Sequence, residues 1–220
     1  MSLALDHLVV AARTLEEGAR WLEDRTGVPT AAGGRHALMG THNRLMALGD
    51  GAYLEIIAID PQAPPPRRPR WFGLDSPAMG ARLARGPALI HWVVRTGDID
   101  AARAAVPDLV GDVLDLERGD YRWRIGVPAD GSLPADGVFP TLIQWQGERH
   151  PAGALPHSGC RLDRLTIRAP RAFGSLHALR GLGLPAEAPV DFVESDSPGL
   201  SAELRSPGGM VLLPEFAGGE

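Results

Sequence analysis

A short pattern of apolar and polar positions occurs three times along the chain. It reads Leu5-Asp6-His7-Leu8-Val9-Val10, then Leu89-Ile90-His91-Trp92-Val93-Val94, and finally Leu162-Asp163-Arg164-Leu165-Thr166-Ile167. Alternation over six residues predicts a β-strand, and each copy leads through a polar turn into residues with helical spacing. Self-similarity of this kind predicts a duplicated supersecondary unit.

The residues after the first strand predict one helix and then a hairpin. Thr14 is a suitable N-cap, Glu17 completes a capping box, and Gly27 ends the helix. Apolar stretches at 36–48 and 53–59 flank Gly49-Asp50-Gly51, a sequence typical of a hairpin turn. The first unit is therefore strand, helix, and two or three antiparallel strands.

The same order is expected twice more. The proline-rich segment 61–70 predicts a semi-rigid linker. A short helix is expected at 77–85, a second unit has its helix at 99–106, and residues 128–139 form a loop that borders a pocket. The remaining strands and the third helix are expected at 113–117, 121–127, 140–146, 172–182, 201–204 and 210–213.

Composition narrows the functional class. The 220 residues are 44% hydrophobic and 22% charged, which suits a globular core. The net charge of −5 argues against non-specific nucleic-acid binding. No apolar run is long enough to span a bilayer, and Cys160 is the single cysteine, so we expect a cytoplasmic protein without disulfides.

Histidines at the same place in the first two strands are the most specific chemical signal. Because side chains alternate along a strand, Leu5, His7 and Val9 share one face, and His91 takes the same place in the second copy. Two imidazoles and the Glu55 carboxylate, on the strand after the hairpin, are a donor set suited to Fe, Zn, Mn or Ni. Arg164 replaces histidine in the third copy. The alternative, that such residues are hydrogen-bonded core positions, stays open.

Other polar and aromatic residues are weaker candidates. His36, His42 and Asn43 lie at a glycine-rich strand start, where they bind a substrate oxygen or merely cap a turn. The tryptophans of the strands are core or pocket wall, and core is favoured. Arginines in the proline-rich segment fit a solvated linker better than an anion site. The late histidines have no counterpart in the repeat: His150, His157 and His177.

Paired strand-helix-strand-strand-strand units resemble the vicinal oxygen chelate superfamily, which includes glyoxalases, bleomycin-resistance proteins and extradiol dioxygenases. The resemblance is carried by Asp6-His7-Leu8-Val9-Val10 and Tyr53-Leu54-Glu55-Ile56-Ile57, and by Gly34-Arg35-His36 with Gly40-Thr41-His42-Asn43, as in the glyoxalase-like subgroup. It implies an α+β fold in which repeated βαβββ modules form a curved half-barrel of mixed sheet with helices outside. Residues 1–150 would hold the paired modules (3–60 and 88–147), and 160–216 a third, packed on the same unit or at a dimer interface.

The resemblance also implies a site on the concave face. The metal ligands would be His7, Glu55 and His91, and Glu55 and His36 would be catalytic. Gln144 stands where metal-dependent members usually have glutamate, so a proton transfer that uses that glutamate is in doubt. The substrate-binding residues would be His36, Thr41, Asn43, Gln144 and Trp145.

Two main functions follow from these expectations. One is a metal-assisted lyase, isomerase or dioxygenase that acts on a small oxygenated metabolite. The other is a metal-free protein that sequesters a small molecule. A third module that mainly builds a dimer is a further alternative. We expect a small-molecule ligand, a homodimer, and no nucleotide cofactor, nucleic-acid partner or membrane partner.

Overall fold

A computed structural model describes residues 2–170 and 172–213 of the chain. The first repeat consists of β1 (Leu3–Ala11), α1 (Leu15–Thr26), β2 (Ala31–His36), β3 (Thr41–Ala47) and β4 (Tyr53–Ile59). The second contains β5 (Ala88–Thr96), α3 (Ile99–Ala105), α4 (Pro107–Val110), β6 (Asp112–Arg118), β7 (Tyr121–Val127) and β8 (Thr141–Gln146). Between them lie the short helices η1 (Trp71–Gly73) and α2 (Pro77–Leu83), and η2 (Pro134–Gly137) precedes β8.

The local signals that predicted α1 act as expected. The Thr14 side chain accepts a hydrogen bond from the backbone N–H of Glu17, and Gly27 ends the helix in the left-handed conformation at φ 70°. Such caps satisfy backbone groups that have no partner within the helix. The hairpin turn also has positive φ, at Gly49, Asp50 and Gly51.

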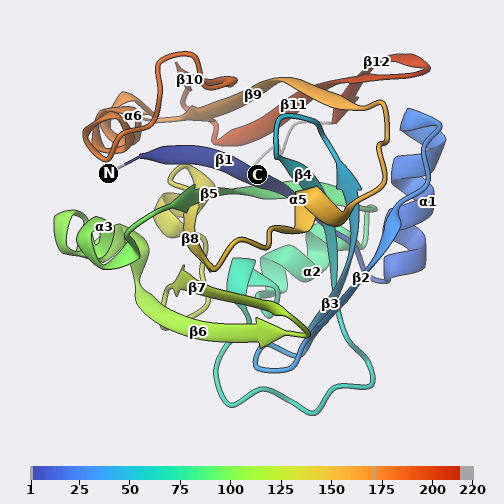
Figure 1. Ribbon diagram of the computed structural model, residues 1–220, viewed down its shortest axis with the longest axis horizontal. Helices are drawn as coiled ribbons and strands as arrows, with labels where there is room; N and C mark the ends of the chain where they lie inside the picture. The colour runs from blue at the N-terminus through green and yellow to red at the C-terminus, as the bar shows by residue number, and fades with distance from the viewer. Residues whose placement is uncertain (1, 171, 214–220) are drawn as a thin grey trace.

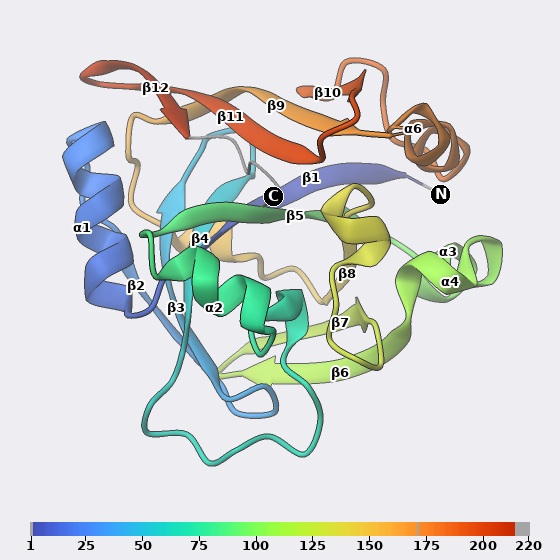
Figure 2. The same cartoon turned by 180° about the vertical axis from the view of Figure 1, so that it is seen from behind.

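The first two repeats join into one sheet of eight strands in the order β2-β3-β4-β1-β5-β8-β7-β6. β1 is parallel to β4, β5 is parallel to β8, and the two first strands pair antiparallel with each other. The sheet curls so that its edge strands β2 and β6 approach one another, as Figures 1 and 2 show. This curled sheet is the mixed α+β half-barrel expected from the sequence.

The third repeat makes a separate sheet with another strand order. It contains β9 (Arg161–Ala169), α6 (Ala172–Gly181), β10 (Val190–Glu194), β11 (Gly199–Ser206) and β12 (Gly209–Leu213), after the short helix α5 (Pro151–Ala154). The order is β10-β9-β11-β12, so β9 lies between β10 and β11 of its own repeat. In contrast, β1 and β5 each pair with the last strand of their own repeat and with each other. The pattern of the sequence did not indicate β10.

Apolar residues form two cores, one on each face of the eight-stranded sheet. Leu8, Trp92 and Leu54 on the convex face pack in one cluster with Leu165 and Ile167 of β9. The four-stranded sheet therefore covers this face (Figure 1). The concave face holds the second cluster, which includes Trp71 and Phe72 of η1.

The proline-rich segment is an anchored strap that forms a wide loop below β3 and β6 in the view of Figure 2. Arg68 donates a hydrogen bond to the carbonyl of Pro128, 3.1 Å away, and Arg70 makes a 2.7 Å ion pair with Asp75. These two arginine side chains are largely buried, at 19% and 15% exposure. The expectation of a solvated linker is therefore wrong for them. Within the described ranges, no helix has the length and apolar character needed to cross a membrane.

Candidate functional site

A β-bulge in β1 brings two neighbouring side chains to one site. The pairing with β5 shifts between Leu5 and His7, so Asp6 is the extra residue. Strict alternation would direct Asp6 to the opposite face. Instead, the Nδ1–H of His7 donates to Asp6 Oδ1 at 2.6 Å, and Trp145 Nε1 donates to Asp6 Oδ2 at 2.9 Å. His150 Nε2 lies 2.9 Å from the same oxygen, so Asp6 is a buried carboxylate with three partners.

The other end of the His7 ring faces Glu55. His7 Nε2 is 3.5 Å from Glu55 Oε2, and the Asn43 amide donates to Glu55 Oε1 at 2.6 Å. Arg118 lies at the end of β6, and its side chain reaches the strands of the first repeat. There it donates a hydrogen bond to Asn43 Oδ1 on β3 at 3.1 Å. The Nη1 atom of Arg118 is also 3.3 Å from His36 Nε2. Both repeats therefore contribute to one polar cluster.

The charges in the cluster follow from these contacts. Burial opposes the charged form of His7, but hydrogen bonds to Asp6 and Glu55 outweigh it and raise the pKa of His7 to about 9. Burial acts against the Glu55 carboxylate too, and its bond to His7 nevertheless lowers its pKa to about 2. Burial also opposes the charged form of Asp6, and hydrogen bonds from His150 and His7 nevertheless lower its pKa. Burial lowers the pKa of His36 to about 4, and nearby Arg118 adds to that effect. At pH 7, a cationic His7 lies between two carboxylates beside a neutral His36.

Aromatic rings enclose the cluster. The cavity bounded by His7, His36, Asn43, Glu55 and Arg118 is walled by Trp71, Phe72, Trp123 and Trp145, and its volume is about 30 Å³. That space holds roughly two water molecules. Rings around a few convergent polar groups are typical of a small-molecule site.

The two repeats differ at the position that mirrors Glu55. In the first repeat, Val9 pairs with Glu55, and in the second, Val93 pairs with Thr141. His7 and His91 stand two residues before these partners, so the register makes Thr141 the counterpart of Glu55, whereas the sequence pattern aligns Gln144 with it. Gln144 lies on the other face of β8. Its amide donates to the carbonyl of Gly97 and accepts from the N–H of Ile99, at the start of α3.

His91 is held apart from the His7 cluster. Its Nε2 accepts a 3.0 Å hydrogen bond from the backbone N–H of Thr141, and Phe72 packs on the ring at a centroid distance of 5.5 Å. His91 is fully buried and does not line the cavity. Burial lowers its pKa to about 3, so the ring is neutral.

These donors do not form a three-ligand metal site as arranged. Among the described residues, no group of three or more His, Cys, Asp or Glu side chains is positioned to hold a metal ion. His7 and Glu55 would supply two ligands of such a site, with Asp6 as the carboxylate that accepts the second N–H of His7. Ligating histidines commonly donate their second N–H to a carboxylate. The second repeat has Thr141 in place of a carboxylate, and Nε2 of His91 already accepts a hydrogen bond from the backbone N–H of Thr141. A metal held by His7, Glu55 and His91 stays a prediction.

The remaining sequence candidates lie at different distances from the cavity. Thr41 is buried, with its hydroxyl 3.1 Å from His36 Nδ1. Trp145 lines the cavity, and His42 does not. Sequence reasoning missed Asp6, Arg118 and His150. The hydrophobic periodicity of the sequence does not mark these residues. Asp6 reaches the site because of the β-bulge, Arg118 because the edge strands β2 and β6 meet, and His150 because it lies in the loop after β8.

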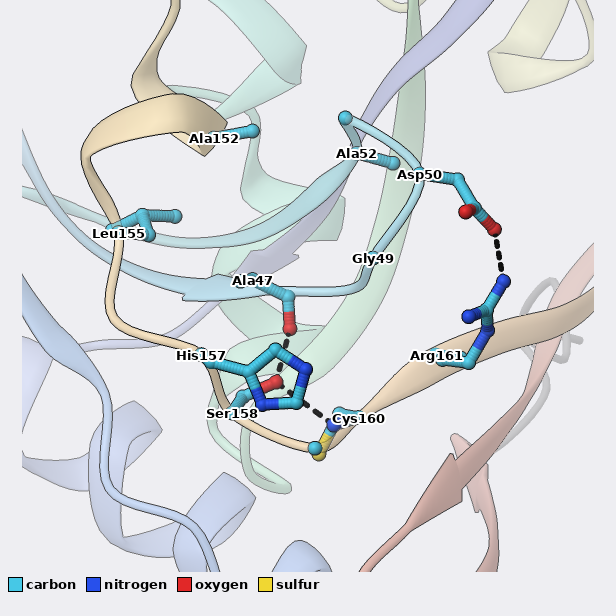
Figure 3. A pocket seen from close by; sticks show the side chains of 12 residues that line it. Ala47, Gly49, Asp50, Ala52, Ala152, Leu155, His157, Ser158, Cys160 and Arg161 are labelled. Carbon is cyan, nitrogen blue, oxygen red and sulfur yellow. Dashed lines mark hydrogen bonds and ion pairs between the residues drawn. The ribbon is translucent and has the colours of Figure 1, made fainter.

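A larger hollow lies elsewhere, between the β3–β4 turn and the segment after α5 (Figure 3). Its volume is about 340 Å³. The Ser158 hydroxyl donates to the carbonyl of Ala47, and Asp50 pairs with Arg161 at 2.5 Å. Burial raises the pKa of the Cys160 thiol, which disfavours the reactive thiolate. Ser158, Asp50 and Arg161 in this hollow are engaged by these contacts, and the chemistry points to the His7 cavity.

Comparison with known proteins agrees with this architecture. A family model described as a glyoxalase-like domain matches residues 5–182. The chain belongs to the glyoxalase-like family. This family assignment places it in the vicinal oxygen chelate superfamily, as the repeated strands indicated. No curated protein matches the chain significantly.

Solved structures were also found to be similar to this glyoxalase-like protein. A hypothetical protein from Staphylococcus aureus is 12% identical, with a TM-score of 0.57 over 100% of this chain and 87% of that one. Methylmalonyl-CoA epimerase from Mycobacterium tuberculosis is 20% identical over 66% of this chain and 89% of that one, with a TM-score of 0.42. At 12% identity the likeness to the Staphylococcus aureus protein concerns the fold alone.

Proposed function

We propose that this glyoxalase-like protein is an enzyme that binds a small oxygenated metabolite in the His7 cavity. It catalyses proton transfer next to a carbonyl group, as an isomerase or lyase does. The supporting observation is the pair of His36 and Arg118, a neutral imidazole 3.3 Å from a guanidinium at one buried, ring-lined cavity. A base and a fixed cation are the two groups that such a reaction needs.

Each residue has a defined part in this proposal. His36 Nε2 takes the proton from the carbon next to the carbonyl, and the electron pair of the broken C–H bond moves onto the carbonyl oxygen. Arg118 stabilises the resulting enolate. The enolate then recovers the proton at carbon, or it expels a leaving group. Asn43 and Glu55 are positioning residues that hold Arg118 and His7.

A test does not require the natural substrate. Pyruvate in D₂O exchanges its methyl protons through an enolate, and ¹H NMR follows the loss of the methyl signal. The protein, dialysed against EDTA, is expected to accelerate this exchange. His36→Gln and Arg118→Met should each lower the acceleration about 100-fold or more. His42→Gln, which changes a histidine outside the cavity, is the matched control and should exchange like the wild type.

Other outcomes distinguish the alternatives. Pyruvate binding without exchange, unchanged in His36→Gln, would overturn the enzyme proposal in favour of a binding protein. Exchange that appears only after Mn²⁺, Fe²⁺, Ni²⁺ or Zn²⁺ is added, and that His7→Ala and Glu55→Ala abolish, would overturn the metal-free step. That result would support the metal expected from the sequence.

A further inference from the structure

The η1 turn forms part of the cavity wall and has an unusual backbone conformation. Phe72 has φ 59° and ψ 23°, a left-handed geometry that bulky residues rarely adopt. Its ring is buried, at 3% exposure, between Trp71 and His91. A strained residue persists only where the surroundings hold it.

Polar contacts of Arg70 and Gly73 are among those that hold the turn. The backbone N–H of Arg70 donates to Asp75 Oδ2 at 2.8 Å, and the guanidinium of Arg70 donates to Asp75 Oδ1 at 2.7 Å. The N–H of Gly73 donates to the carbonyl of Gly131 at 2.8 Å. These few contacts lie at the end of the proline-rich strap, so the turn can open without disrupting a sheet.

The buried polar atoms that lack partners among the described residues include Trp71 Nε1 in this turn, and Nδ1 of His91, the β5 residue whose ring packs on Phe72. Since His91 Nε2 accepts from the N–H of Thr141, the ring proton is on Nδ1. The indole nitrogen of Trp71 is also a donor only. Buried donors normally have an acceptor, so these two N–H groups are available to acceptor oxygens from outside the chain.

Cavity size leads to the same conclusion. About 30 Å³ is far below the several hundred Å³ typical of ligand sites. A metabolite with a carbonyl group and even one carboxylate exceeds this volume, and movement of part of the wall would admit more of it. The Trp71–Phe72 turn is the wall segment that is both strained and held outside the sheets.

We propose that the Trp71–Phe72 turn is a gate, and that its opening lets the N–H groups of His91 and Trp71 bind the carboxylate or carbonyl oxygens of the ligand. The inference deepens the proposed function, since it names an acceptor-rich ligand for the same cavity. It assigns His91 to substrate binding through Nδ1.

Hydrogen exchange tests the gate without any ligand. Amides of residues 70–76 are expected to exchange through local opening, faster than those of β1 and β5. Phe72→Ala and Phe72→Gly both lack the ring, but only alanine keeps the backbone strain. Exchange of this segment should therefore be about 5- to 30-fold faster in Phe72→Ala than in Phe72→Gly. Asp75→Asn should accelerate the same amides, while Asp24→Asn on α1 should not. Exchange of 70–76 only through global unfolding would overturn the gate.

Oxalate tests the binding role, because it offers four acceptor oxygens and no proton to exchange. In protein labelled with ¹⁵N-histidine, oxalate should shift the Nδ1 signal of His91, and His91→Phe should weaken oxalate binding at least 10-fold. If oxalate binds with that signal unmoved and His91→Phe binds equally well, the inference fails, while pyruvate exchange still decides the proposed function. If His91→Phe fails to fold, the Nδ1 shift in the wild type decides. Absence of oxalate binding in wild type and Phe72→Ala overturns the inference.

Discussion

Replacing His7 by glutamine should remove a specific part of the pH dependence of stability. The folded protein raises the pKa of His7 from 6.5 to about 9, because the hydrogen bonds to Asp6 and Glu55 outweigh the cost of burial. A raised pKa means that the folded state holds the proton more tightly than the unfolded chain. The stabilisation is therefore complete below pH 6.5 and is lost as the pH rises through about 9.

The magnitude follows from the size of the shift. One pKa unit corresponds to about 1.4 kcal/mol, so His7 accounts for about 3 kcal/mol of unfolding free energy between pH 6.5 and 9. Asp6 and Glu55 have lowered pKa values, so their contributions change only on the acid side. The contributions of His36 and His91 to the unfolding free energy change below pH 6.5, since the pKa values of these two residues are lowered.

Urea unfolding of EDTA-treated protein at pH 6, 7, 8, 9 and 10, followed by tryptophan fluorescence, measures the effect. From pH 6 to 10 the wild type should lose about 3 kcal/mol more than His7→Gln. His157→Gln, which changes an exposed histidine, should follow the wild type. Profiles of wild type and His7→Gln that stay parallel within about 1 kcal/mol would refute the assignment of a buried, charged His7.

Three further substitutions test separate parts of the structure. Asn43→Ala removes the 2.6 Å hydrogen bond to buried Glu55 and should lower the unfolding free energy by about 1–3 kcal/mol in urea titrations; an unchanged value would contradict that bond. Gln144→Ala should cost about 1 kcal/mol by freeing the start of α3, with oxalate affinity unchanged; weaker oxalate binding would return Gln144 to the site. Thr14→Ala should cost about 1 kcal/mol through the lost N-cap of α1, measured the same way, and a neutral effect would show that packing alone fixes this helix.

Much of the fold was encoded locally. Alternation in 5–10 and 89–94, the caps Thr14 and Gly27, and the turn at 49–51 depend on neighbouring residues, and they predicted the strands, α1 and the hairpin. Repetition with family resemblance then indicated the curled sheet. β10 was not predicted, because its five residues are not part of the repeated strand pattern and no hairpin turn marks them.

The site depended on information that local pattern does not contain. The shift of register at Asp6 turns that carboxylate toward His7, and the meeting of β2 with β6 carries Arg118 to His36. Pairing of β5 with β8 decides that Thr141, and not Gln144, mirrors Glu55. The sequence by itself determined the repeated module and the histidines it carries. Only the tertiary structure decided their partners, because strand register and barrel closure are set by contacts between residues far apart in the chain.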